Sequence, residues 1–144
     1  MNISEIYNKI MTKSSANLSD NHTTNSDVQK YKRLCESTFH MDMDKEYFDF
    51  LLLMNGFELN GFNFYGTSEQ KRQFILNGYE QNIFWRSEIE ELSAYYLIGD
   101  GDMDFYCFNP IEKNYIVLTK ATTQLVGNYK YFTDILCEVI EIYG

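Results

Sequence analysis

Three aspartates at alternating positions, in the run Asp100-Gly-Asp102-Met-Asp104, form the densest group of possible metal ligands in this sequence. Carboxylates at this spacing can bind calcium, and the first three ligand positions of an EF-hand loop share it. The rest of such a loop is missing, because Phe105 stands where the sharp turn needs glycine and Ile111 stands where a bidentate glutamate belongs. We interpret the run as a solvated turn, or as an acidic patch facing a partner. A metal-dependent enzyme using Asp100–Asp104 is the least favoured alternative.

A second group of acids, Glu88, Glu90 and Glu91, follows Trp85 closely and could include a catalytic carboxylate pair. A hydrolytic pair needs one carboxyl group with a raised pKa, inside a pocket and at a set distance from the other. A solvated run of glutamates offers none of these features. The group therefore predicts a charged surface.

Aromatic side chains lie beside these acids, among them Trp85, Tyr95 and Tyr96. Each joins an apolar ring to a polar tip, which is the chemistry of residues that anchor protein interfaces. Core packing is the alternative for any aromatic residue inside a predicted helix or strand. We keep Trp85, Tyr95 and Tyr96 as candidate anchors of a binding surface.

The remaining residues with catalytic potential do not form a recognisable set. Neither His22 nor His40 has Cys, Asp or Glu neighbours at the spacing of a zinc site. The sequence has no glycine-rich phosphate-binding loop and no nucleophile elbow. Cysteines at 35, 107 and 137 suggest neither a disulfide framework nor a metal knuckle, and favour buried thiols in a reducing compartment. We predict a protein that is not an enzyme and holds no cofactor or metal.

The chain is strongly acidic, with a formal net charge of −9 at pH 7. Residues 36–58 carry six acids against one base, and residues 80–112 carry eight acids against one base. A field of this sign attracts basic surfaces and repels the phosphate backbone of nucleic acids. We therefore predict a protein partner with a basic surface, and no nucleic acid.

Length and composition indicate one domain, covering residues 1–144, that buries its own core. Uninterrupted apolar runs such as 50–54 are about five residues long, whereas a membrane span needs about 20. The first residues lack the basic and then apolar pattern of a signal peptide. We expect a cytoplasmic protein that does not associate with membranes.

Hydrophobic periodicity predicts helices in the first part of the chain, strands in the middle and one helix at the end. Helices are expected at 3–13, from Ser26 or Asp27 to about Ser37, at 45–54 after an Asp44 cap, and from a Thr133 cap to the chain end. The polar composition of residues 14–25 predicts a surface loop. Residues 67–86 are harder to interpret, with Thr67 or Ser68 as possible helix caps and a helical turn after Gly78.

Alternating residues around Asn60-Gly61 predict a tight hairpin between 57–59 and 62–64. Further strands are expected at 95–98, 105–108, 115–119 and 122–126, with turns at Gly99–Asp102 and at 109–114. Tight turns between consecutive strands make the sheet antiparallel. The class is therefore α+β, with a central antiparallel sheet of about 4–6 strands flanked by N-terminal helices and a C-terminal helix. If the strand 115–119 lies at an edge, it could pair with a second copy, so a monomer or a weak homodimer is expected.

Four segments taken together resemble the SUKH superfamily, which includes bacterial immunity proteins and a fungal regulator of cell-wall synthesis. Tyr47–Gly56 (YFDFLLLMNG) is similar to the end of the family's helix, and Gly61–Gly66 (GFNFYG) follows as its first hairpin does. Tyr96–Asp100 (YLIGD) with Phe105–Phe108 (FYCF) is similar to its central strands, and Phe132–Ile142 to its last helix. The resemblance covers about residues 40–143. Asp44 stands where the family usually has proline, and the subfamily is left open.

The resemblance implies a central antiparallel sheet, no enzymatic activity, and binding to a cognate toxin. Together with the charge, it predicts an immunity protein that neutralises a secreted or contact-dependent toxin, such as a nuclease, by covering its basic active site. A regulatory interaction module without a toxin partner is the alternative. The predicted partner-binding residues are Trp85, Glu88, Glu90, Glu91, Tyr95, Tyr96, Asp100, Asp102 and Asp104.

Overall fold

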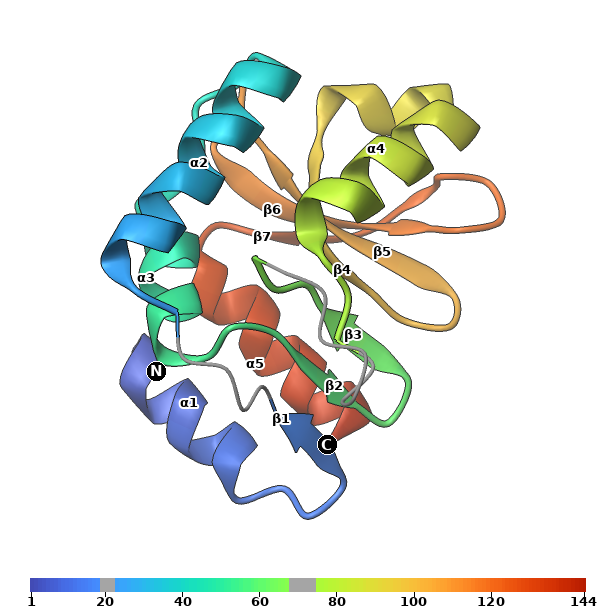
Figure 1. Cartoon of the computed structure of the whole chain (residues 1–144). Coiled ribbons are helices and arrows are strands. Elements are labelled where there is room, and N and C mark those ends of the chain that lie inside the picture. Colours follow the sequence, from blue (N-terminus) through green and yellow to red (C-terminus); the bar gives the residue numbers. More distant parts are fainter. Residues whose placement is uncertain (19–22, 68–74) are drawn as a thin grey trace.

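The computed structural model describes residues 1–18, 23–67 and 75–144. In these residues, one antiparallel sheet contains seven strands, each paired with the next along the chain (Figure 1). The strands are β1 (Ala16–Leu18), β2 (Phe57–Leu59), β3 (Phe62–Phe64), β4 (Tyr96–Asp100), β5 (Asp104–Asn109), β6 (Asn114–Thr119) and β7 (Leu125–Tyr129). The helices are α1 (Ile3–Met11), α2 (Asn25–Phe39), α3 (Lys45–Leu53), α4 (Gly78–Glu88), the 3-10 helix η2 (Glu90–Ala94) and α5 (Phe132–Tyr143). The predicted α+β class is confirmed, with more strands than expected.

Local sequence signals set two of the boundaries as predicted. Asp44 caps α3, with its carboxylate accepting a hydrogen bond from the backbone N–H of Glu46. Asn60 and Gly61 join β2 to β3 with φ angles of 49° and 96°. A type I′ turn needs positive φ at both central residues, and an Asn-Gly pair adopts these angles readily.

Other predicted boundaries were wrong. The stretch 14–25 is not simply a loop, since it contains β1, which pairs with β2. Thr24 caps α2 in place of Ser26 or Asp27. Thr133 does not cap α5: the N-cap position is Tyr131, without a side-chain hydrogen bond, and the backbone N–H of Thr133 faces the carboxylate of Glu46. The possible cap at Ser68 lies outside the described residues.

Both faces of the sheet are covered. Helices α1, α2, α3 and α5 build the large core against one face, where Tyr96, Tyr106 and Phe108 are buried. Helix α4 and η2 build the small core against the other face (Figure 1). In β5, Phe105 and Cys107 enter the small core, whereas Tyr106 and Phe108 enter the large core. Alternate side chains of a strand point to opposite faces of the sheet. Because both faces are covered, all four residues from Phe105 to Phe108 are apolar or aromatic.

The order of the strands places β7 at one edge of the sheet. The prediction that residues 115–119 could form an edge is therefore wrong, because β6 lies between β5 and β7. In the described part of the chain, none of the helices is sufficiently long and apolar to cross a membrane.

Candidate interaction surface

Helix α4 presents an unusual combination of residues to solvent. Ile83 and Phe84 are 44% and 51% exposed, although both are large and apolar. Glu80 and Glu88 are exposed on the same helix, on either side of this apolar pair. Interface hot spots often have this composition, an aromatic anchor surrounded by polar groups. We call these four residues the α4 surface.

The position of the α4 surface follows from how α4 is attached to the sheet. The side chain of Asn77 accepts a hydrogen bond from the backbone N–H of Glu80 and caps the helix at its first turn. One turn further on, Asn82 is fully buried and bonds to the backbone of Leu97 in β4. Residues 83 and 84 follow directly and point away from the sheet.

The sequence itself contains a signal for the α4 surface, apart from the acids. Ile83, Phe84 and Trp85 are three consecutive large apolar residues. On a helix, successive side chains are about 100° apart, so three in a row cannot all face one core. A helical assignment of this segment therefore implies that at least one of them is exposed.

Trp85 faces the small core and is only partly available as an anchor. Its ring packs edge-on against Phe105, with 4.9 Å between the centroids. The ammonium group of Lys120 lies 5.4 Å from the ring centroid of Trp85. The indole N–H is buried and has no hydrogen-bond partner among the described residues.

The two tyrosines predicted as anchors are placed differently from each other. Tyr95 is half-buried against the small core. Tyr96 is fully buried in the large core, where its hydroxyl bonds to that of Tyr31. The prediction that Tyr96 anchors a partner is wrong, because the inward side of β4 carries its ring away from the surface.

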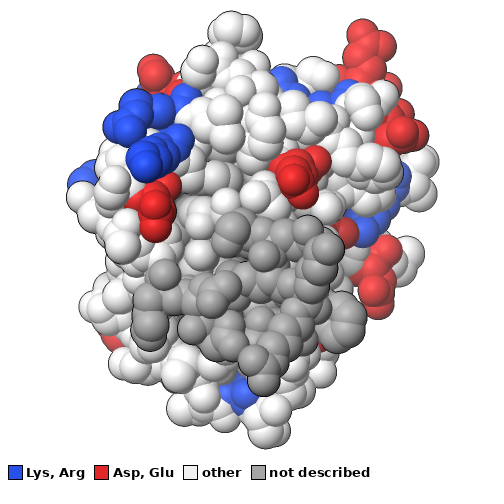
Figure 2. All heavy atoms as spheres, in the orientation of Figure 1, with Lys and Arg blue, Asp and Glu red and all other residues white. Residues whose placement is uncertain are grey.

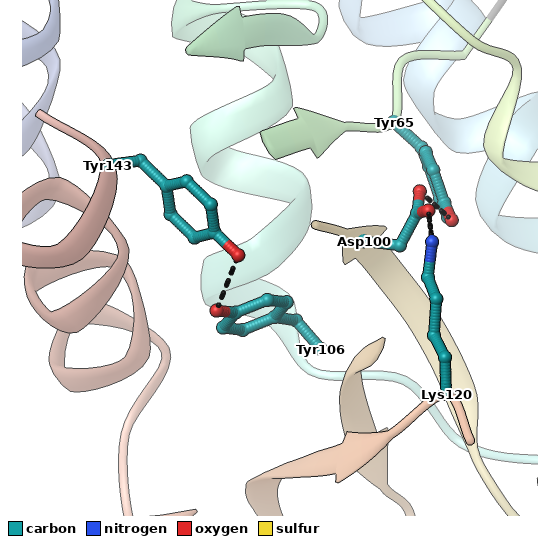
Figure 3. A network of polar contacts seen from close by, with 5 residues as sticks. All are labelled: Tyr65, Asp100, Tyr106, Lys120 and Tyr143. Atoms are coloured by element: carbon teal, nitrogen blue, oxygen red, sulfur yellow. Dashed lines mark hydrogen bonds and ion pairs between the residues drawn. The ribbon is translucent and has the colours of Figure 1, made fainter. Parts of the chain in front are cut away.

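Asp100 is also removed from the predicted surface. Its carboxylate is largely buried, forms an ion pair with Lys120, and accepts a hydrogen bond of 2.7 Å from the hydroxyl of Tyr65 (Figure 3). Burial, and secondly the negative charge of Asp100, hold the pKa of Tyr65 well above its ordinary value, so this phenol keeps its proton. Tyr106 and Tyr143 form a separate pair in the same view (Figure 3). Asp100 is therefore a structural residue and not a free carboxylate.

The partners of Asp100 also bear on its use as a metal ligand. Asp100 already has two protein partners, and the described residues contain no group of three or more His, Cys, Asp or Glu side chains that could hold a metal ion. Asp102 is exposed and lies against the β2–β3 turn, where a Cβ atom on Gly61 would come within 3.3 Å of Oδ1. Asp104 is half-buried.

The acidic residues form two groups and not one continuous patch. Glu88, Glu90 and Glu91 are exposed just before β4 begins, and Asp102 is exposed just after β4 ends. Five residues of β4 separate the groups by roughly 15 Å, at about 3.3 Å per residue. On the face seen in Figure 2, acids lie in separate clusters with basic residues among them. Of these acids, Glu88 belongs to the α4 surface, and Glu90 and Glu91 follow it directly in η2.

The exposed glutamates are not neutralised within the described residues. The ion pairs found there are Lys45–Asp49 on α3 and Lys120–Asp100 at the sheet. Glu88, Glu90 and Glu91 have no such partner in this part of the chain. Their negative charge is consequently available to another molecule.

No protein-family model matches this chain, and no curated protein matches it. The resemblance to the SUKH superfamily therefore remains a prediction from the sequence motifs.

Proposed function

We propose that this protein is a non-enzymatic binding protein of the immunity type, and that the α4 surface contacts its partner. The observation that carries the proposal is the exposure of Ile83 and Phe84 between Glu80 and Glu88 on one helix. Exposed apolar residues rimmed by charges are typical of protein-binding sites. The partner would be a secreted or contact-dependent toxin, such as a nuclease.

The apolar pair and the acids would have different roles in this complex. Phe84 would fill an apolar depression on the partner and contribute much of the affinity, as central aromatic residues do. Glu88, Glu90 and Glu91 would face the basic groove in which a nuclease binds phosphate. Charge complementarity of this kind raises the association rate and weakens with salt.

The experiment begins with affinity capture of partners from cells that encode this chain, followed by binding measurements with the purified partner. The double variant I83S/F84S is expected to bind at least about 100-fold more weakly than the wild type, as loss of a hot spot does. I111S is the matched control, because Ile111 is 82% exposed on the distant β5–β6 turn. This control should bind like the wild type.

Equal binding by the wild type and I83S/F84S would remove the α4 surface from the proposal. The immunity role is tested separately, by asking whether the chain blocks the activity of the captured protein and protects cells that express it. A partner that binds through α4 but harms no cell would favour the regulatory module instead.

A further inference from the structure

A cavity of about 410 Å³ lies between the first turn of α3, the β5–β6 turn and the start of α5. Cavities of roughly 300–1,000 Å³ are the usual size for small-molecule sites. None of its lining residues belongs to the α4 surface. Any ligand held here would therefore be additional to the proposed protein partner.

The walls of this cavity are largely apolar and aromatic. Phe108 and Phe132 are buried and form its floor. Met43 is half-buried, and Tyr131 is 55% exposed. Such walls suit a flat apolar group, which could lie over the floor between Met43 and Tyr131.

Two carboxylates line the cavity, but the protein's own donors already engage both. Asp44 caps α3 and accepts a hydrogen bond of 2.7 Å from the hydroxyl of Tyr115. The carboxylate of Glu46 faces the backbone N–H of Thr133 in the first turn of α5. Both carboxylates thus lie at helix N-termini, whose partial positive charge offsets part of their negative charge.

Three lysines also line the cavity, and two of them lack an acidic partner. Lys45 pairs with Asp49 at 2.8 Å, whereas Lys113 and Lys130 form no ion pair with any described residue. The ammonium group of Lys130 lies 5.3 Å from the ring centroid of Tyr131, which keeps it beside the aromatic wall. The backbone of Lys113 is fixed in the β5–β6 turn, where its N–H donates to the carbonyl of Asn109 at 2.8 Å.

Basic residues gather at this cavity although the whole protein is acidic. The chain has a net charge of −9, yet three of its 12 Lys and Arg residues line this one cavity. Because Lys45 is paired with Asp49, Lys113 and Lys130 are the two lysines that remain for a ligand, next to the apolar walls.

We propose that this cavity binds a small organic anion with one negative charge and a flat apolar body, of the aromatic carboxylate class. The carboxylate would lie between the ammonium groups of Lys113 and Lys130, and the body would contact Met43, Phe108 and Tyr131.

The test is a calorimetric titration of the whole chain with 2-naphthoate and, as a neutral probe of the same shape, 2-naphthamide. Naphthoate should bind at least about tenfold more tightly than the amide, because charge-assisted hydrogen bonds to ammonium groups are the stronger ones. The variant K113Q/K130Q should lose about tenfold in affinity for naphthoate and little for the amide. Amide resonances of residues 43–46 and 130–132 should shift on titration.

The control variant K9Q/K30Q changes the net charge by the same amount, through exposed lysines on α1 and α2. It should bind naphthoate like the wild type, whereas Y131A should weaken both probes. The proposal is overturned if naphthoate does not bind, if the amide binds equally well, or if K9Q/K30Q weakens binding as much as K113Q/K130Q. The variant I83S/F84S should bind naphthoate like the wild type. The proposed anion site can therefore be judged separately from the proposed role of the α4 surface in partner binding.

Discussion

The side-chain amide of Asn82 bonds to both backbone groups of Leu97, accepting from the N–H at 2.7 Å and donating to the carbonyl at 2.9 Å. The same amide nitrogen also donates to the carbonyl of Gly78 at 2.8 Å. Asn82 therefore makes the two backbone hydrogen bonds to Leu97 that a neighbouring strand would otherwise make. Through it, the sheet fixes the orientation of α4, and with it the exposure of Ile83 and Phe84.

Replacing Asn82 with alanine should lower the free energy of unfolding by about 3 kcal/mol, because buried backbone groups of Leu97 lose their partners. Denaturant unfolding measures this change. The control N17A removes a side-chain bond to Glu58 on the surface, and should change stability by less than about 0.5 kcal/mol. A similar small effect for N82A would mean that α4 is held mainly by apolar contacts.

Breaking the ion pair between Lys120 and Asp100 should lower the free energy of unfolding more than breaking a surface ion pair does. The side chains of Lys120 and Asp100 are 25% and 12% exposed, and K120M would leave the carboxylate without its cation. We expect a loss of about 2 kcal/mol in unfolding free energy. The double variant D100N/K120M should recover part of it, because no unpaired charge remains.

Lys45 provides the comparison for this experiment. It pairs with Asp49 in an i,i+4 arrangement on α3, and its side chain is 84% exposed. K45M should leave stability unchanged within error. If K120M behaved like K45M, solvent would be screening the Lys120–Asp100 pair.

Charge reversal at Asp100 and at Asp102 should have different effects on stability, although both residues lie in the same acidic run. D102K should fold like the wild type, since Asp102 is exposed and changes in such positions are usually small. D100K should lose at least about 3 kcal/mol, because it removes the acceptor of the Tyr65 hydroxyl and brings two ammonium groups together. Thermal unfolding of both variants checks this, and equal melting temperatures would contradict it.

Once the partner is purified, charge reversal can test whether Glu88, Glu90 and Glu91 speed its association. E88K/E90K/E91K should slow association about tenfold or more at low salt, and the difference from the wild type should shrink as salt is added. D102K should have a smaller effect, because β4 separates it from the α4 surface. Stopped-flow or surface plasmon resonance gives these rates. A larger effect of D102K would place the partner at the β4–β5 turn.

Alkaline pH should destabilise the fold through Cys35. Burial raises the pKa of this thiol from 9.0 to about 11, despite its contact with the hydroxyl of Tyr96. The thiol ionises near pH 9 only after unfolding, so unfolding releases a proton between pH 9 and 11. Cys35 alone should therefore lower the free energy of unfolding by roughly 1 kcal/mol per pH unit in this range, and the thiol of Cys107, whose pKa burial also raises, adds to the fall.

The variant C35A isolates this contribution. Its stability should fall less steeply than that of the wild type between pH 9 and 10, whatever its stability at pH 7. Buried tyrosines such as Tyr31 and Tyr96, whose pKa values burial also raises, should destabilise both proteins at higher pH. Identical slopes for the two proteins would show that Cys35 does not titrate with unfolding.

Local signals in the sequence were sufficient for those parts of the fold that depend on a few neighbouring residues. The β2–β3 turn follows from Asn60-Gly61, and the start of α3 follows from Asp44. Strand β1 escaped prediction because three residues carry little periodicity, and the strand exists only by pairing with β2, about 40 residues away. Helix α5 was predicted, but its Thr133 cap was wrong, because the first turn of α5 faces Glu46 of α3, a residue far away in the chain.

The residue types available for the candidate surface can be read directly from the chain: an acidic stretch, three apolar residues in a row, and two tyrosines where β4 begins. Which of these residues reach solvent depends on how the helices and strands pack. Tyr96, the first residue of β4, is buried in the large core, whereas Tyr95, just before β4, packs half-buried against the small core. Asp100 is paired because Lys120, 20 residues further along and just after the end of β6, brings its ammonium group to the Asp100 carboxylate. Exposure and charge pairing depend on contacts between distant segments, and a linear sequence specifies these contacts only through the complete fold.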